Sequence, residues 1–448
     1  MEHASISTNV QPIPVFKTSP FRPMKAIVGD LGRAFETLGD VIQVKGFPAR
    51  VFCLRNPAHI EQLFYHPTIG GTKFPTILPR VKNVMRTGAY ILKGGEDWKD
   101  RRVPVQKGFK GEYLNRYLQH VSPLVAKLLE QWEALFQQRG EVDIVPGLQS
   151  VITQINFKQY FSIDLQGDEL EQVRRQTHFI ELNFVTPWPL WIPLPDHFKF
   201  RQYAGELRTR FYMLLRARRA HPSEAHDALA ILLNARHKET DPAWSDDEIV
   251  DEMFSIYFGA SVMATTLAWA LYLLGSDPEI QENLRVEANR VHNSRLPLAS
   301  DLDQLPYSEM VLKETLRIYP PSWGFPRYAE DKFTFDGYEI PAHSLIIPII
   351  YHTHRIPTLW ESPNAFRPER FAATAAKLPN LAFFPFGSGQ RPCLGINLAP
   401  MVMRLTLSQI VQKLKFNFTP RFNGDPVADF GFEIHPADAV IIRKTGAA

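Results

Sequence analysis

The stretch Phe386-Gly387-Ser388-Gly389-Gln390-Arg391-Pro392-Cys393-Leu394-Gly395 decides the fold. Its glycines and its proline predict a tight loop, and the apolar pattern that follows predicts a helix from about 394 to 414. Cys393 then stands at the start of that helix, where the helix dipole and the free N–H groups favour a thiolate. Arg391 adds positive charge, and the small residue Gly395 leaves space for a flat group close to the backbone.

Two interpretations of Cys393 follow from the residues alone. A thiolate on a glycine-rich loop is suited to be an axial ligand of heme iron. A free cysteine is more often a small buried hydrophobe without chemistry. Cys53 is the one other cysteine of the sequence, so we expect neither a disulfide framework nor a multi-cysteine zinc site.

The spacing of Phe386, Gly389, Arg391, Cys393 and Gly395 resembles the heme-binding signature of the cytochrome P-450 family. The resemblance implies that Cys393 is the metal ligand of heme b, iron protoporphyrin IX. It implies that the other four residues shape the cofactor-binding loop. The resemblance spans roughly residues 30 to 443, because further motifs follow in the family's order.

Those further motifs lie before the cysteine loop and resemble family elements one by one. In the family, residues at the positions of Glu314, Arg317 and Arg370 form a buried triad that locks the core beside the heme loop. The Trp98–Arg102 element corresponds to one that contacts a heme propionate, and Arg327 corresponds to another propionate partner. A doubly anionic heme edge needs such cations if it is to be buried.

The pattern along the rest of the chain is mostly helical from about residue 95 onward. Helices are expected at 114–140, 151–164, 168–182, 197–219, 227–236 and 306–319, and strands at 41–44, 49–54, 333–338 and 344–351. The predicted fold class is mainly α, a single helix-rich cytochrome P-450-type domain with small peripheral β-sheets. Residues 1–30 are expected to be an extended lead-in, and residues 31–448 the catalytic domain.

The segment Phe254–Leu274 carries no charged residue and is long enough to span a bilayer. Its internal serines and threonines suit a protein interior, and acidic residues flank it on both sides. A capping box at Ser245–Glu248 predicts where the helix begins, and Gly275 predicts where it ends. We therefore expect a buried central helix and no membrane span.

The charge balance excludes a dedicated nucleic-acid binder, because Lys+Arg total 50 against Asp+Glu 47 and the net charge is +3. No signal peptide is visible at the N-terminus. The expectation is a cytoplasmic monomer.

The central helix departs from the family pattern, in which an acidic residue is followed by threonine. Ser261 stands at the acid position and Val262 at the alcohol position, and valine cannot hydrogen-bond to dioxygen or order a water. Thr265 lies one turn further on and would serve only if the helix were locally distorted. Ser261 and Thr265 are the candidate catalytic residues, although Ser261 could instead back-bond to the carbonyl of Tyr257.

The resemblance implies a substrate pocket that is bulky and aromatic, which suits a lipophilic terpenoid, fatty acyl or aromatic natural product of secondary metabolism. Its candidate lining residues are Phe74, Ile77, Tyr90, Trp188, Phe254, Phe258, Val262, Ser322, Trp323, Phe325 and Phe432.

The implied function is that of a heme-thiolate monooxygenase that hydroxylates this molecule with O2 and two external electrons. One alternative is unconventional chemistry, such as oxidative coupling, desaturation, rearrangement or peroxide-driven oxidation, because of Ser261 and Val262. Another is a non-catalytic heme or ligand binder. An acidic ferredoxin or flavodoxin is the expected electron donor, docking on a basic patch that contains Lys99, Arg101, Lys107 and Lys110.

Overall fold

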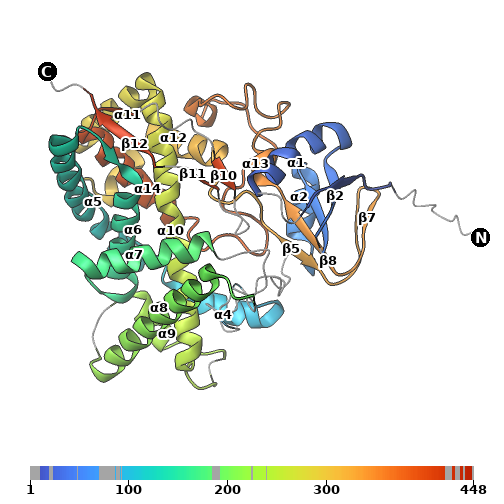
Figure 1. The fold of residues 1–448 in the computed structure, drawn as a ribbon, viewed down its shortest axis with the longest axis horizontal. Coiled ribbons are helices and arrows are strands. Elements are labelled where there is room, and N and C mark those ends of the chain that lie inside the picture. Colours follow the sequence, from blue (N-terminus) through green and yellow to red (C-terminus); the bar gives the residue numbers. More distant parts are fainter. Residues whose placement is uncertain are drawn as a thin grey trace, which may run out of the picture.

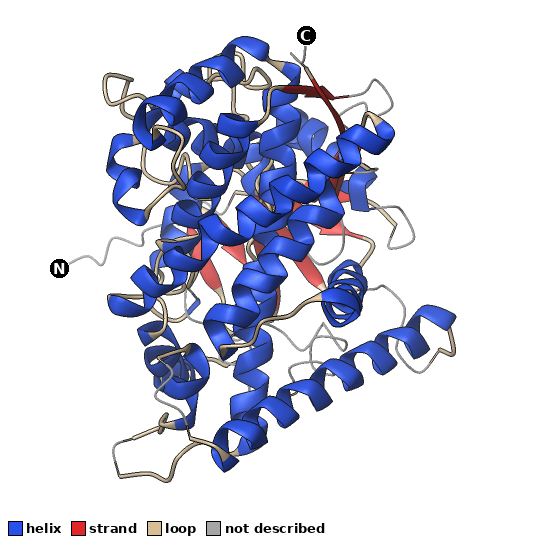
Figure 2. Ribbon diagram, turned by 90° about the vertical axis from the view of Figure 1, so that its left-hand side faces the viewer, coloured by secondary structure: helices blue, strands red, loops and turns tan. Residues whose placement is uncertain are grey.

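The computed structural model describes residues 11–19, 24–47, 49–69, 86, 91, 93–183, 192–222, 226–238, 240–418, 426–428, 434–436 and 439–445. The described part is mostly helical, with small sheets, and this confirms the predicted fold class. Figures 1 and 2 show helices making up most of the molecule, with the strands gathered in small groups.

The α-helices are α1 (Met24–Leu38), α2 (Pro57–Tyr65), α4 (Gly95–Lys107), α5 (Glu112–Arg139), α6 (Ile144–Phe161), α7 (Gly167–Leu182), α8 (Pro195–Ala220), α9 (Ala228–Leu233), α10 (Asp246–Ser276), α11 (Pro278–His292), α12 (Pro306–Ile318), α13 (Ile350–Thr353) and α14 (Leu398–Lys413). Two 3₁₀ helices are η3 (Ala299–Gln304) and η4 (Pro368–Phe371).

The largest described sheet has five strands in the order β1 (Val15–Lys17), β2 (Val41–Lys45), β3 (Arg50–Leu54), β8 (Ser344–Pro348) and β5 (Arg327–Ala329). It is mixed: β2 and β3 are antiparallel, whereas β3 and β8 are parallel. It lies to one side of the molecule, near α1 and α2 (Figure 1).

The remaining described strands form small sheets. They are the hairpin of β6 (Phe333–Phe335) with β7 (Tyr338–Ile340), the pair of β10 (Pro426–Ala428) with β11 (Ile434–Pro436), and the group of β4 (Val142–Asp143), β12 (Ile441–Lys444) and β9 (Phe416–Phe418).

Helix α10 runs through the middle of the molecule (Figure 1). The Ser245 hydroxyl accepts a hydrogen bond from the backbone N–H of Glu248, and the Glu248 carboxylate accepts one from the N–H of Ser245, so the predicted capping box is present. At 1.5 Å per residue, its 31 residues span about 45 Å. Among the described residues, α10 is the one helix long and apolar enough to cross a membrane, and most of it is buried within the protein, as in a core helix.

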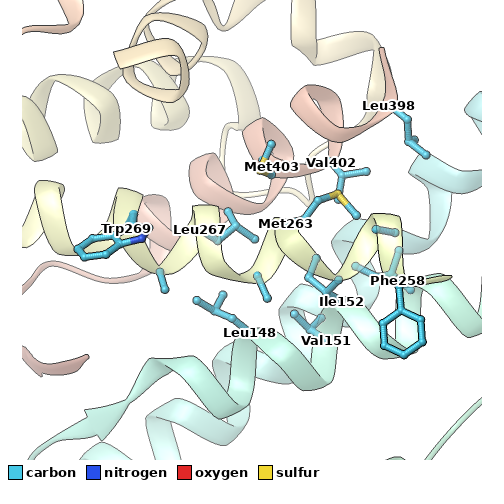
Figure 3. Close-up of a cluster of buried hydrophobic side chains, with 14 of the residues drawn as sticks. Leu148, Val151, Ile152, Phe258, Met263, Leu267, Trp269, Leu398, Val402 and Met403 are labelled. Atoms are coloured by element: carbon cyan, nitrogen blue, oxygen red, sulfur yellow. The ribbon is translucent and has the colours of Figure 1, made fainter. Parts of the chain in front are cut away.

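Apolar side chains from two neighbouring helices enclose α10. Leu148, Val151 and Ile152 of α6 lie on one side, and Val402 and Met403 of α14 lie on the other (Figure 3). All five side chains are buried, so this three-layer packing forms the centre of the core and fixes how α10 is rotated about its axis.

Several element predictions differ from the structure. The extended lead-in expected at 1–30 is helical from Met24, where α1 begins, and the strand expected at 344–351 ends at Pro348 before α13. The strand expected at 333–338 is a hairpin, because Asp336 and Gly337 both adopt positive φ angles, of 43° and 80°, which a two-residue turn requires. Helix α6 begins at Ile144 and not at 151. Asp143 caps it by accepting from the N–H of Val145 at 3.1 Å, and a proline in the first turn removes no helical hydrogen bond.

The close approach of α5 and α6 gives a test of the packing. A Cβ added at Gly147 of α6 would lie 2.6 Å from Nε1 of the buried Trp132 and 2.8 Å from Cδ1 of Leu128. We therefore expect Gly147→Ala to lower the free energy of unfolding by about 1–3 kcal/mol in urea denaturation. The matched control is Gly205→Ala in α8, where the added Cβ meets nothing within 4 Å. It should stabilise by up to about 1 kcal/mol, and equal effects of the two variants would contradict the packing argument.

Candidate active site

The cysteine loop, residues 386–395, is shaped by two glycines. Gly387 and Gly389 have φ angles of 68° and 71°, a region that side chains disfavour. A Cβ at Gly389 would lie 2.2 Å from the carbonyl oxygen of Phe64, so α2 can pack against the loop only if this residue is glycine. The N–H of Cys393 donates to the carbonyl of Phe386 at 2.8 Å and closes the loop.

The position of Cys393 relative to α14 differs from the prediction. The helix begins at Leu398 and not at 394, and Gly395 and Asn397 lie in turns that precede it. Glycine is a poor helix former, which explains the late start. Cys393 therefore does not lie in the first helical turn, and the expected contribution of the helix dipole to its thiolate is weakened.

The chemistry of the Cys393 thiol is set by its surroundings. Burial raises the pKa of the thiol, while the N–H of Gly395 and the charge of Arg102 act to lower it. The side chain nevertheless keeps accessible surface. A sulfur that is enclosed by protein yet accessible faces an opening, which is what an axial ligand requires.

Three arginines from different elements gather beside this loop. Arg102 of α4 donates to the carbonyl of Pro392 at 2.9 Å. The guanidinium of Arg391 lies over the ring of Trp98, 4.8 Å from its centroid. Arg327, the first residue of β5, lies 4.8 Å from the ring centroid of Phe64.

Arg327 shows that this region carries excess positive charge. Its Nε is buried and has no hydrogen-bond partner among the described residues. Burial, together with the nearby charge of Arg391, lowers the pKa of Arg327 to about 10. Arg327 and Arg391 are both partly shielded from solvent and repel each other, so an anionic group placed between them would be favoured.

The face of α10 that turns toward α14 offers open space. Met263 lies beside Val402 and Met403 of α14 in Figure 3. Gly259 lies one turn before Met263 on the same face. It is exposed although its helix is buried, and an added Cβ there would meet nothing within 4 Å. Val262, three residues after Gly259 and half-buried, borders this open space.

The predicted catalytic alcohols occupy the other side of α10. Ser261 and Thr265 line a cavity together with residues of α6 and α7. The Ser261 hydroxyl donates to the carbonyl of Phe258 at 2.7 Å, so the back-bond exists but to a different carbonyl from that of Tyr257. Helix α10 is continuous through Thr265, without the local distortion that would turn this residue toward Cys393.

Glu314, Arg317 and Arg370 are brought together by α12 and η4. Arg317 donates two hydrogen bonds to the Glu314 carboxylate, at 2.7 and 2.8 Å, and Arg370 donates a third at 3.2 Å. Glu314 and Arg317 are completely buried. The Glu314 carboxylate also accepts from the backbone N–H of Arg367, so one side chain joins the two elements.

The predicted pocket residues fall into two groups. Phe74, Ile77, Tyr90, Trp188 and Phe432 lie outside the described residues. Of the others, Phe254 is completely buried and stacks on Phe258 at 5.9 Å.

The loop after α12 contributes the remaining members. Ser322 donates to the carbonyl of Gly324 at 3.0 Å, and Trp323 is buried in the core. The ring of Phe325 lies 3.5 Å from where a Cβ of Gly387 would stand, so this residue reaches the cysteine loop.

One member of the predicted basic patch is not on the surface. Arg101 is buried and pairs with Glu248 of α10 at 2.5 Å, with Glu252 at 3.7 Å. Including it in a docking surface was therefore wrong, because its charge is used to join α4 to α10. Lys99, Lys107 and Lys110 are exposed.

These features fit a heme. The enclosed but accessible sulfur of Cys393 can ligate iron, the open face at Gly259 can receive a flat ring, and Arg327 carries the buried charge that a propionate would pair with. Fold and site together define a helical heme-thiolate protein.

Comparisons with known proteins agree with this class. The family model "Cytochrome P450" matches residues 9–437. The chain belongs to the cytochrome P450 family and is a cytochrome P450 oxidoreductase with a heme iron cofactor.

Individual relatives span most of the chain. A putative cytochrome P450 120 of Synechocystis is 30% identical over 75% of this chain and 74% of the relative. Cyclooctat-9-en-7-ol 5-monooxygenase of Streptomyces melanosporofaciens is 25% identical over 85% of this chain and 83% of the relative. The solved structure of retinoic acid-bound cyanobacterial CYP120A1 superposes with a TM-score of 0.85 at 24% identity, covering 97% of this chain and 99% of that one.

Sequence reasoning missed two features of the site. The stacking of Arg391 on Trp98 links the cysteine loop to α4. The hydrogen bond from Arg102 to the carbonyl of Pro392 is a second link between the same two elements. Both pairs are far apart in sequence, so no local pattern signals them. The burial of Arg101 had a weak signal, because two acids one turn apart, Glu248 and Glu252, begin α10.

The buried triad gives a stability test. Glu314→Ala leaves the completely buried Arg317 without its carboxylate. We expect a loss of about 3–5 kcal/mol in the free energy of unfolding, because a buried charge is left uncompensated. The matched control is Lys313→Ala, which removes an exposed pair with Glu309 on the same helix and should cost at most about 1 kcal/mol. Losses of equal size in the two variants would contradict the role given to the triad.

Proposed function

We propose that this chain is a heme-thiolate monooxygenase that hydroxylates a lipophilic small molecule. The observation that carries the proposal is the enclosed, accessible sulfur of Cys393 on a loop bordered by the buried Arg102 and the half-buried Arg327 and Arg391. When bound, the heme supplies the oxygen activation and the redox chemistry. The chain holds it, orients the substrate and excludes water.

We propose heme b as the form of the cofactor, with Cys393 as its axial ligand. Phe386, Gly389 and Gly395 give the loop its shape, and Arg391 and Trp98 stack beside it. Arg102, Arg327 and Arg391 are the proposed partners of the propionates, since a dianion would relieve the repulsion between Arg327 and Arg391.

A terpenoid is the substrate class that the comparisons favour within the lipophilic molecules. Two relatives from Streptomyces melanosporofaciens carry the names "Cyclooctat-9-en-7-ol 5-monooxygenase" and "Cyclooctatin synthase". The described candidates Phe258, Val262 and Phe325 are apolar, as such a substrate needs. A role in secondary metabolism follows from the same proposal.

The absence of an acid–threonine pair favours a second candidate chemistry. Val262 borders the open face of α10 and offers no hydroxyl to hold a proton or a water. The alternative is therefore coupling, desaturation, rearrangement or peroxide-driven oxidation at the same heme. A catalytic part for Ser261 or Thr265 requires water that reaches around α10, because both lie on its other side.

Electrons are proposed to come from an acidic ferredoxin or flavodoxin that docks over the exposed lysines of α4 and the turn that follows it. Lys99, Lys107 and Lys110 supply the charge, and the exposed Val103 supplies an apolar contact. We further propose a cytoplasmic monomer. Its single catalytic domain begins before residue 31, because β1 and α1 pack with the rest of the chain.

The ligand assignment is tested by the reduced carbon-monoxide difference spectrum. The wild-type protein should show a band at roughly 450 nm, because thiolate donation shifts the Soret transition. Cys393→Ser should lose this band. Cys53→Ser is the matched control and should keep it, since Cys53 is buried in β3, away from the loop. Persistence of the band in Cys393→Ser would refute the assignment.

The role of position 262 is tested by electron coupling. We expect the reconstituted enzyme to release much of its electron supply as hydrogen peroxide when the true substrate is absent. Val262→Thr adds a hydroxyl on the open face of α10 and should change coupling or product ratio without changing the fold. Val262→Ala, which removes methyl groups without adding a hydroxyl, is the control. Tight coupling of the wild type with arbitrary ligands would count against this interpretation.

A further inference from the structure

A second cavity lies on the side of α10 away from Cys393. It has a volume of about 360 Å³ and is lined by residues of α6, α7, α10 and β11, together with Asp143 of β4 and Ala439. We call it the rear cavity. Figure 3 shows that α6 packs on the side of α10 opposite α14, so α10 separates the rear cavity from the proposed cofactor site. The proposed iron ligand, propionate partners and described substrate-lining residues do not line this space, although the candidate alcohols Ser261 and Thr265 do.

One wall of the rear cavity presents a hydrogen-bond donor with a fixed position. Arg174 donates through Nη1 to Oε1 of Gln149 at 2.8 Å, which fixes the orientation of the amide. The amide nitrogen of Gln149 then faces Nδ1 of His178 at 3.0 Å. An amide nitrogen can only donate, so Nδ1 accepts.

The tautomer of His178 follows from this network. Burial lowers the pKa of His178, so the ring is neutral near pH 7. Since Nδ1 accepts, the single ring proton is on Nε2. The neutral ring cannot take a second proton at Nδ1 without losing its bond to Gln149. His178 is therefore a fixed donor and a poor proton shuttle.

The other polar groups of the rear cavity are two carboxylates, the hydroxyls of serine and threonine side chains, and the imidazole of His435, whose Nδ1 lies 3.0 Å from the carbonyl oxygen of Pro436. Glu181 and Asp143 contribute carboxylates. Ser261 gives its hydroxyl hydrogen to the carbonyl of Phe258, which leaves its oxygen lone pairs for a ligand. Arg174 does not make the cavity cationic, because it forms two hydrogen bonds with the Glu171 carboxylate, at 2.8 and 2.7 Å.

The carboxylates and the His178 N–H of the rear cavity together favour a neutral ligand over a charged one. The carboxylates disfavour an anion. An ammonium group would leave the His178 N–H without an acceptor, which is costly for a buried donor. A hydroxyl group satisfies both requirements, because its oxygen accepts from His178 while its hydrogen is donated to a carboxylate or to Ser261.

Several other lining residues are apolar, so we expect the part of the ligand beyond its hydroxyl group to be apolar. Ile152, Leu182, Ala264, Ala268 and Pro436 contribute aliphatic surface between the polar groups. Cavities of roughly 300–1,000 Å³ that combine apolar walls with a few placed polar groups are typical of small-molecule sites.

We propose that the rear cavity is a second binding site, for a neutral lipophilic alcohol whose hydroxyl accepts a hydrogen bond from Nε2 of His178. The identity of the physiological ligand rests on the proposed function: hydroxylation of a lipophile yields an alcohol of this class, so the product binds behind α10.

The binding test uses the heme-loaded protein with its active site filled by clotrimazole, an azole that ligates heme iron. Menthol, a neutral alcohol, is then titrated by calorimetry. We expect saturable binding at one site without a change in the Soret band. p-Menthane, the same skeleton without the hydroxyl, should bind at least ten-fold more weakly. Absence of menthol binding, or equal binding of the two probes, would overturn the proposal.

Variants place the bound menthol in the rear cavity. His178→Phe keeps a ring but removes the donor and should weaken menthol binding about ten-fold. Ala268→Leu fills the cavity and should abolish it. His120→Phe in α5, a half-buried histidine outside the cavity lining, is the matched control and should leave the affinity unchanged. Unchanged affinity in both His178→Phe and Ala268→Leu, with native circular dichroism, would refute the site.

A second readout does not depend on any ligand. In ¹⁵N spectra of histidine-labelled protein, the signal lost in His178→Phe should show the Nε2–H tautomer at pH 7. An Nδ1–H tautomer or a charged ring would overturn the proposed donor. Failure of the monooxygenase proposal is distinguishable, because it would appear as the absence of oxidised product when O2 and electrons are supplied, while the menthol titration reports on the rear cavity alone.

Discussion

The constraint on which the site depends is buried positive charge beside the cysteine loop. Arg327 is enclosed, close to Arg391, and burial and repulsion together lower its pKa to about 10. Stacking on Phe64 and Trp98 orients the two guanidinium groups. Shielding such charges from water lowers the free energy of unfolding unless an anion pairs with them. The same arginines that weaken the protein alone therefore prepare it for a dianionic cofactor.

The buried triad also contains an arginine that is shielded from water, but here a carboxylate of the protein itself pairs with it. Arg317 is as deeply buried as any side chain of the described core, yet Glu314 pairs with it through two hydrogen bonds. Backbone carbonyls of His354 and Pro363 accept further hydrogen bonds from it. The charge is thus satisfied within the protein, and the segments that lead to the cysteine loop are fixed. The Glu314–Arg317 pair is structural because its charges are paired within the protein. Arg327 is suited to ligand binding because burial and the charge of Arg391 lower its pKa.

The sequence predicted the fold and the tight turn of the cysteine loop well, because both depend on local patterns. The capping box at Ser245 marked the start of α10, and the glycines at 387 and 389 marked the loop. The errors came from tertiary contacts. Arg101 resembled a surface cation in its local sequence, but Glu248 lies 147 positions further along the chain and buries it. The late start of α14 and the hairpin at Asp336-Gly337 were set by turn geometry that apolar periodicity does not reveal.

The two departures of α10 from the family pattern act on different sides of the helix. Val262 shares the open side with Gly259, so its missing hydroxyl affects the space where the cofactor is proposed to lie. Ser261 turns toward α6 and α7, where an acidic side chain would have added a charge to a cavity that already holds Asp143 and Glu181. Replacing that acid by serine therefore keeps the rear cavity able to accept a neutral ligand. Adjacent positions on a helix point about 100° apart. For this reason Val262 borders the proposed cofactor space, while its neighbour Ser261 borders the rear cavity.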